Sequence, residues 1–380
     1  MDLSLTTEQE EVRRLARDFA EREVQPRAEA IDQRLEFPND LVEKAAGLGL
    51  LGMLVPEPFG GAGLDHLSFA LFIEEVAKFS ASTAVILDVH TSVGTEPIVL
   101  FGSAEQKRRW LPDLAQGRKL AAFALTEPEA GSDASHLKTA AERRGTDYIL
   151  NGSKIFITNA GEADSYIVMA ATRPGSGAAG VSAFVVSSDN PGLTVGPPFK
   201  KMGLNGSAIA EVFFKDCEVP ASDRLGAEGE GFRIAMRALD SGRIGISAQA
   251  VGLAQGALDD AVAYAQERKQ FNRPIAELQT IQNKIADMGV KVSAARWLTW
   301  NAAARCDAGL PFTKEASMAK LYSTDMAMEV TLEALQVFGG YGYLEEYPMA
   351  RRVRDAKACQ IYEGTNQVQR IVIARELLSA

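Results

Sequence analysis

The stretch YILNGSKIFITN, residues 148–159, determines how this chain of 380 residues is organised. Its β-branched and aromatic residues are typical of a strand, and Asn-Gly is a strong hairpin signal. Similar short apolar runs occupy 166–169, 181–186 and 210–214, and no helical pattern of 10–15 residues separates them. We therefore expect an antiparallel β domain and not a parallel sheet with crossover helices.

Helical patterns lie on both sides of this β region. Before it, Thr7 precedes Glu10 and Ser103 precedes Gln106 in the spacing of a capping box, and apolar stripes follow at helical spacing. After it, amphipathic patterns cover 232–265, 277–305, 315–338 and 366–378. The fold class is therefore α+β and mostly α. We expect an N-terminal helical domain over 1–120, a middle antiparallel β domain over 121–225 and a C-terminal helical bundle over 226–380.

Composition and charge exclude several classes of protein. With 50 acidic and 40 basic residues the net charge is −10, which disfavours a nucleic-acid or anionic-membrane partner. The local basic clusters 268–269 and 351–354 are either solvated helix faces or sites for anionic ligands. Three cysteines and three histidines lie scattered, so we expect no disulfide and no metal site. With no targeting pattern and no apolar run of bilayer length, we expect a cytoplasmic protein with no membrane partner.

The segment IYEGTN, residues 361–366, contains the strongest candidate for a catalytic group. Glu363 stands in an apolar run before Gly364, and Thr365 is a good N-cap for the helical pattern behind it. A carboxylate in such surroundings has a raised pKa, which suits a base that works near neutral pH. The alternative is an ordinary Glu that interacts favourably with a helix dipole.

Other motifs have an ordinary and a functional interpretation. Residues 123–133 run from a strand into a hydroxyl- and Gly-rich loop, which suits the polar edge of a planar ring. Phe156 and Thr158 share one strand face and provide an aromatic wall and a hydroxyl donor, as a flavin site would need. Arg and Phe in 267–274 suit a pyrophosphate and an adenine, or merely a helix end. The Gly-dense turn 336–343 indicates backbone packed against a bulky group.

Taken together and in this order, TEPEAGSD, NGSKIFITN, ERKQFNRPI, QVFGGYGYLEEYPMARRVRD and IYEGTNQVQR resemble the acyl-CoA dehydrogenase family over nearly the whole chain. The resemblance implies an α–β–α domain order with a C-terminal four-helix domain, FAD as cofactor and a homotetramer built as a dimer of dimers. In such a tetramer FAD reaches into a neighbouring subunit. By this match, the residues that bind FAD are Phe123, Leu125, Thr126, Gly131, Ser132, Phe156, Ile157, Thr158, Arg268, Phe271, Gln279, Gln336, Val337, Gly339, Gly340, Thr365 and Gln367.

The resemblance also implies the reaction. Glu363 matches the catalytic base, which takes the α-proton of an acyl-CoA thioester while the β-hydride passes to flavin N5. Substrate contacts match Ser132, Asp240, Arg243 and Gly364. Some relatives carry their base at the position of Gly242, which cannot serve here. An electron-transfer flavoprotein is the expected partner for reoxidation.

Substrate range is less constrained by the sequence. The segment SGRIGISAQAVGLAQ, residues 241–255, looks closest to short-chain and short-branched-chain enzymes, so we expect a short to medium saturated acyl-CoA. Ala84 stands where relatives that oxidise glutaryl thioesters have Arg, which disfavours a dicarboxylic substrate. The alternatives are an acyl-CoA oxidase that uses oxygen and a non-catalytic assembly protein of the same fold. Nitroalkane oxidase relatives use Asp as base, and Glu363 argues against them.

Overall fold

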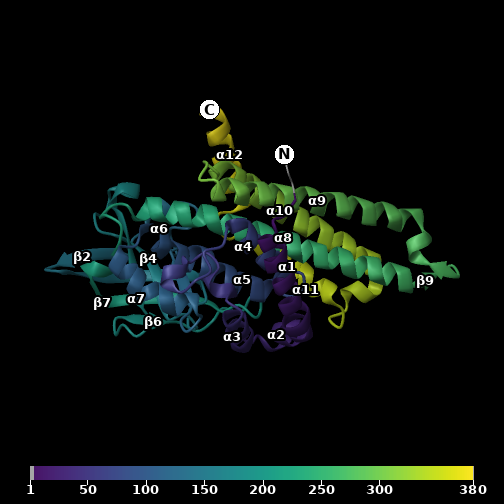
Figure 1. Cartoon of the computed structure of the whole chain (residues 1–380), viewed down its shortest axis with the longest axis horizontal. Helices are drawn as coiled ribbons and strands as arrows, with labels where there is room; N and C mark the ends of the chain where they lie inside the picture. The colour runs from purple at the N-terminus through teal and green to yellow at the C-terminus, as the bar shows by residue number, and fades with distance from the viewer. Residues whose placement is uncertain (1–3, 380) are drawn as a thin grey trace.

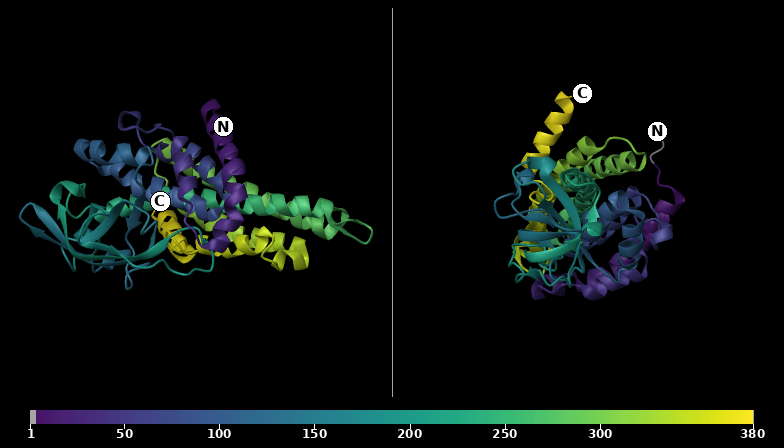
Figure 2. Two further views of the ribbon diagram at one scale, coloured as in Figure 1. Left: turned by 90° about the horizontal axis from the view of Figure 1, so that it is seen from below. Right: turned by 90° about the vertical axis from the view of Figure 1, so that its left-hand side faces the viewer.

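The computed structural model describes residues 4–379, with strands gathered at one end and long helices extending to the other (Figure 1). Helices α8 (Gly231–Glu267), α9 (Gln279–Asp307) and α10 (Thr313–Phe338) lie side by side along the long axis. The N-terminal helices pack against the middle of α8, and the right-hand view shows the C-terminal helix projecting from the body (Figure 2). This arrangement confirms the predicted α+β, mostly helical fold.

The N-terminal region is held together by helices whose ends the sequence marks. Ser103 and Gln106 form the capping box that we predicted for α7. At α1 the predicted Thr7/Glu10 box is wrong by one residue, because the box consists of Thr6 and Gln9. Both Thr6/Gln9 and Thr7/Glu10 have the three-residue spacing of a capping box. The burial of Val12 and Phe19 fixes the helix so that the first pair forms the box. The helices are α1 (Thr7–Phe19), α2 (Ala28–Arg34), α3 (Asn39–Gly47), α4 (His66–Ala77), α5 (Ala81–Val89), α6 (Glu96–Phe101) and α7 (Ala104–Ala115).

The sheet has the strand order β6-β7-β3-β2-β4-β5-β8, with β1 paired to β4. Most pairs are antiparallel as predicted, but β1 and β2 each pair parallel with β4, so the sheet is mixed. The predicted hairpin at Asn151-Gly152 is wrong. Gly152 lies inside β3 at a bulge, where an added Cβ would come within 2.6 Å of Thr139 Cα. The strands are β1 (Ala121–Ala124), β2 (Ala140–Arg144), β3 (Asp147–Thr158), β4 (Ser165–Ala171), β5 (Val181–Ser187), β6 (Leu193–Val195), β7 (Ile209–Pro220) and β8 (Arg224–Leu225), with β9 (Lys269–Gln270) and β10 (Arg273–Pro274) forming a separate ribbon.

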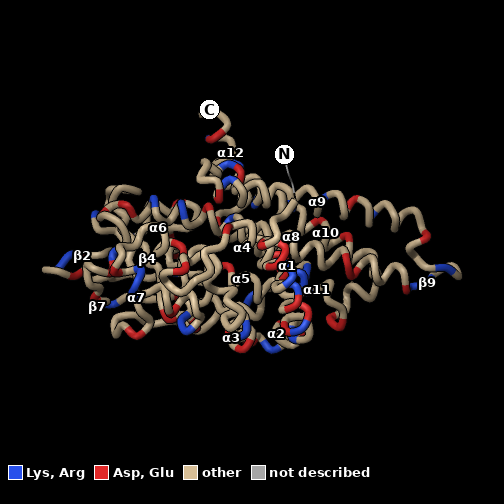
Figure 3. The backbone as a smooth tube through the Cα atoms, viewed as in Figure 1, with Lys and Arg blue, Asp and Glu red and all other residues tan. Residues whose placement is uncertain are grey.

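The C-terminal part contains two further helices, α11 (Pro348–Cys359) and α12 (Asn366–Leu378). We did not predict α11, which carries the basic cluster 351–354. Neither interpretation of that cluster is correct for Arg352, which is buried and pairs with Asp260 at 2.7 Å. Arg354 pairs with Asp32 at 2.5 Å. Acidic and basic segments lie close together in the region of α1, α2 and α11 (Figure 3).

One helical run, Ala81–Phe101, has the length and mean hydropathy of a membrane span. The prediction that no apolar run reaches that length is therefore wrong. Within that run, 83% of the 18-residue window is buried inside the protein. The run is covered by α8 and by β1, so its apolar surface packs in the core.

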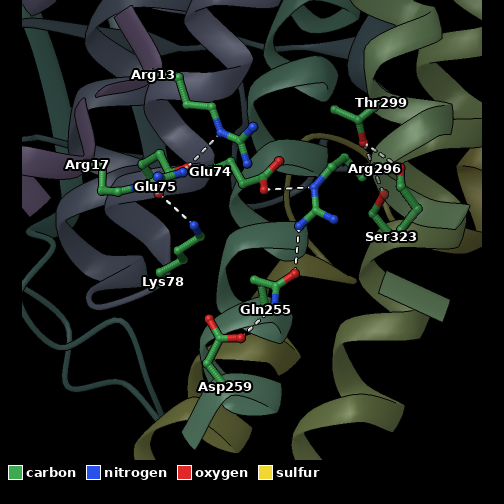
Figure 4. A network of polar contacts seen from close by, with 11 residues as sticks. Arg13, Arg17, Glu74, Glu75, Lys78, Gln255, Asp259, Arg296, Thr299 and Ser323 are labelled. Carbon is green, nitrogen blue, oxygen red and sulfur yellow. Dashed lines mark hydrogen bonds and ion pairs between the residues drawn. The ribbon is translucent and has the colours of Figure 1, made fainter. Parts of the chain in front are cut away.

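A polar network ties the N-terminal helices to the bundle (Figure 4). Arg296 of α9 donates to Glu74 of α4 at 2.9 Å and to Gln255 of α8 at 2.8 Å. Burial raises the pKa of Glu74, although the charges of Arg296 and Lys78 oppose this. The network fixes α4 against α8, and α8 carries part of the candidate site.

Candidate active site

Glu363 lies in the turn between α11 and α12, with a backbone φ of +52°. Few residues other than glycine adopt this conformation, and those that do are enriched at active sites and ligand sites. Both carboxylate oxygens are inaccessible to solvent and have no hydrogen-bond partner within residues 4–379. Burial raises the pKa of Glu363 to about 8, although the charges of Arg243 and Lys320 act in the opposite direction. The structure therefore provides a buried, unpartnered carboxyl group that is basic near neutral pH.

The turn that carries Glu363 is held by side chains from two helices. Lys320 of α10 donates to the Gly364 carbonyl at 2.8 Å and to Asn366 Oδ1 at 2.9 Å. Gln369 of α12 also donates to the Gly364 carbonyl, at 2.9 Å. Gly364 itself has φ +88°, which favours glycine. Thr365 caps α12 as predicted, accepting a bond from Val368 N at 3.3 Å.

The backbone N–H of Glu363 is also free. Among the residues that the structure describes, it donates to no carbonyl or side chain. An unsatisfied N–H beside a carboxylate is suited to bind a polarised carbonyl oxygen of a ligand.

Helix α8 forms the floor of the site. A Cβ added at Gly242 would lie 2.7 Å from Oε1 of Glu363 and 2.8 Å from its Cδ, so the carboxylate rests directly on this glycine. Arg243 is buried, donates to Asp240 at 2.7 Å and approaches the Glu363 carbonyl at 3.4 Å. Residues 240–243 and 363, predicted separately from the sequence, are thus brought together.

A cavity of about 220 Å³ lies between the sheet and this turn. Its walls include Phe156 and Thr158 from β3 and Ile361 and Tyr362 from the segment before the base. Phe156 has φ +59° and is 63% exposed, because a register shift in β3 turns its ring outward. An exposed aromatic ring and a hydroxyl residue on one cavity wall fit one face of a planar ring system. Glu363 is not itself a wall residue of this cavity, although it follows Ile361 and Tyr362 in the chain.

A second cavity, of about 510 Å³, lies at the far end of the bundle. It is lined by Arg268, Phe271, Val337, Gly339 and Gly340, all predicted cofactor residues. The Arg268 guanidinium lies 5.2 Å from the centre of the Tyr341 ring, as in a cation–π contact. From Gly242, on which the carboxylate of Glu363 rests, to Arg268 is roughly 40 Å along α8 at 1.5 Å per residue, so the base and this second cavity lie far apart within one chain.

The remaining predicted site residues are not gathered around either cavity. Ile157 is buried in the sheet core, and Phe123 packs partly buried between the bundle and the sheet. The Leu125 carbonyl accepts a bond from Lys154, and the Thr126 carbonyl accepts one from Ile155 N. Five others line neither of the two cavities and carry exposed side chains or backbone: Gly131, Ser132, Gln279, Gln336 and Gln367.

Sequence reasoning missed several residues that shape the site. Lys154, two residues before Phe156 in β3, forms a buried ion pair with Glu127 at 2.7 Å. Lys320 is fully buried, and a single Lys in the alanine-rich segment 315–327 was a visible signal. Tyr362 donates to Gln249 Oε1 at 2.5 Å, which links the turn to α8, and no local pattern indicated this.

The fold is of the α–β–α type, and the candidate site is a buried carboxyl group in the turn between α11 and α12. Comparison with known proteins gives the same order of three domains. Residues 6–118, 122–217 and 229–378 match the N-terminal, middle and C-terminal domains of acyl-CoA dehydrogenase. The chain belongs to the acyl-CoA dehydrogenase family and is an oxidoreductase.

Individual relatives extend over the full length. An acyl-CoA dehydrogenase of Bacillus subtilis (strain 168) is 51% identical, with 99% of each chain covered. The structure of butyryl-CoA dehydrogenase from Megasphaera elsdenii is 46% identical, with a TM-score of 0.98 and 100% of each chain covered. A structure reported with the electron transferring flavoprotein of Acidaminococcus fermentans has 48% identity and a TM-score of 0.99, again over 100% of each chain.

Proposed function

We propose that the protein removes an α-proton and a β-hydride from a short- to medium-chain acyl-CoA, giving the trans-2-enoyl-CoA, with Glu363 as the base. The observation that supports this most directly is the buried carboxylate of Glu363, which lacks a partner within residues 4–379 and directly follows Ile361 and Tyr362, two wall residues of the cavity that Phe156 also lines. FAD is the cofactor, and when bound it accepts the hydride. The other steps depend on residues of the chain.

Glu363 acts as a base because burial disfavours its ionised form, and proton transfer neutralises it. The free N–H of Glu363 suits the thioester carbonyl oxygen, where negative charge develops as the α-proton leaves. Arg243, close to the same turn, adds positive charge to this region. Asp240 forms an ion pair with Arg243 and holds its side chain in place. The two residues together shape the part of α8 that we assign to the substrate.

The separation of Glu363 and Arg268 along α8 supports an assembly of several copies, which we take to be a homotetramer. Phe156, Thr158 and the turn of Glu363 suit the flavin ring, and Arg268 and Phe271 suit the adenosine diphosphate part of another FAD. Because one molecule cannot span roughly 40 Å of α8 in a single chain, each site is completed by a second copy. Cofactor retention then depends on assembly.

The buried residue Ala84 and the similar proteins of known structure indicate the substrate range and the electron acceptor. Ala84 is fully buried and uncharged, so it offers no partner to a distal carboxylate. The similarity to a butyryl-CoA dehydrogenase supports a short acyl chain. The relative reported with an electron transferring flavoprotein supports an acceptor of that kind.

The test is direct. Purified protein should be yellow, and anaerobic butyryl-CoA should bleach it. Glu363→Gln should retain FAD and reduce the bleaching rate by about 10²–10⁴-fold, the usual contribution of a general base. Near-normal bleaching in that variant would exclude Glu363 as base, rapid peroxide formation in air would indicate an oxidase, and a colourless protein would contradict the proposal.

A further inference from the structure

Asp88 is a buried carboxyl group that the proposed reaction does not use. It lies on α5 and is 0% exposed. Ser92 Oγ donates to its Oδ1 at 3.0 Å, whereas Oδ2 is shielded from solvent and, in the described part of the chain, has no hydrogen-bond partner. A buried carboxylate with so few donors is unfavourable in the ionised form, so the group has a physical reason to keep its proton.

Asp88 and Glu363 rest on neighbouring positions of one face of α8. An added Cβ at Gly242 would lie 2.7 Å from Oε1 of Glu363, and one at Gly245 would lie 2.6 Å from Cγ of Asp88. Helix positions three residues apart have Cβ atoms about 5–6 Å from each other. The two carboxyl groups therefore lie about one helical turn apart, where each charge strongly affects the other in buried surroundings.

The charged groups nearby favour ionisation of only one member of this pair. Lys320 of α10 donates to the turn of Glu363, and Arg243 of α8 approaches the carbonyl of the same residue. The positive charges of both lower the pKa of Glu363 against the larger effect of burial. Asp88 has Ser92 as its donor and no such cation.

The other titratable groups that face this region are neutral. Burial raises the pKa of Cys359 on α11 to about 11 and that of Tyr362 well above its usual range. His90, two residues after Asp88, bonds to the Leu114 carbonyl and to Ala121 N, and burial lowers its pKa to about 4. None of these groups carries a charge that would change which of the two carboxyl groups, Asp88 or Glu363, ionises first. That order is therefore set by Lys320 and Arg243.

We propose that Asp88 is a second titrating acid of the active site, which keeps its proton while Glu363 is ionised. The two groups then hold one negative charge between them and titrate as a coupled pair. When Glu363 takes up a proton, the repulsion that holds the proton on Asp88 ends. Asp88 acts through Glu363, and its reactive significance rests on the proposed function. Burial first, and the charge of Glu363 second, raise the pKa of Asp88 well above its usual range.

An infrared titration of the purified holoenzyme labelled with ¹³C-aspartate tests this proposal without substrate. At neutral pH the spectrum should contain the carbonyl band of a protonated aspartic acid, and Asp88→Asn should abolish it. In Glu363→Gln the midpoint at which this band disappears should fall by about one to three pH units, the size of shift that one charge within about 4–6 Å produces in a carboxyl group. If Asp88→Asn does not fold, Asp88→Ser can be used instead to assign the carbonyl band to Asp88.

The matched control is Glu74→Gln. Glu74 is another buried carboxyl with a raised pKa, but it faces Arg296 and not Asp88 (Figure 4). This variant should leave the midpoint of the aspartate band where it is in the wild type. The proposal is overturned if no band at neutral pH depends on Asp88, or if Glu363→Gln moves the midpoint no more than Glu74→Gln. Because butyryl-CoA is not used, a failure of the dehydrogenase proposal shows separately in the bleaching assay.

Discussion

Gly242→Ala should inactivate the enzyme through a displacement of about 1 Å. The new methyl would lie 2.7 Å from Oε1 of Glu363 and 2.8 Å from its Cδ, and ordinary contacts between such atoms are near 3.5–4.0 Å. The carboxylate must therefore move by roughly 1 Å, and a misplacement of that size costs about 10²-fold in rate. Overpacking opposes the gain in helix propensity, so the net effect on stability should stay within about 1–3 kcal/mol.

The assay is anaerobic stopped-flow bleaching by butyryl-CoA, with FAD content measured from the absorbance of the same sample. Gly289→Ala is the matched control, because Gly289 lies inside α9 and an added Cβ there meets no described atom within 4 Å. It should bleach at the wild-type rate and gain up to about 1 kcal/mol of stability from helix propensity. Wild-type bleaching in Gly242→Ala would refute the placement of Glu363 on α8.

Two further predictions concern stability. Lys154→Met leaves Glu127 buried without its ion-pair partner, so the free energy of unfolding in urea should fall by about 3–5 kcal/mol, and an unchanged midpoint would contradict the pairing. Burial alone would lower the pKa of His66, but bonds to Asp307 and Glu96 outweigh it and raise that pKa well above 6.5. The stabilisation by His66 is therefore complete below about pH 6.5 and lost as pH rises through the raised value. Urea titrations should show this slope, and His66→Gln should flatten it.

The order of helical and β regions was predictable because it depends on local periodicity. The β-branched runs around 148–159 and the amphipathic pattern over 315–338 each carry their own signal. Predictions failed where one local pattern fits two structures. Asn151-Gly152 is both a hairpin signal and a bulge in a long strand, and only pairing of β3 with β7 and β2 selects the bulge. The burial of Arg352 in α11 was missed because the basic cluster 351–354 resembles a solvated helix face.

Glu363 was identifiable from sequence because its apolar neighbours and Gly364 are adjacent in the chain. The tertiary structure alone decided what surrounds it. Lys320, Gly242 and Asp88 lie 43, 121 and 275 residues before Glu363 in the sequence. Packing of α5, α8 and α10 brings them to one carboxylate. Local pattern determines which segments are helix or strand, whereas the electrostatics of a buried group depend on distances in space. These distances exist only once the core has formed.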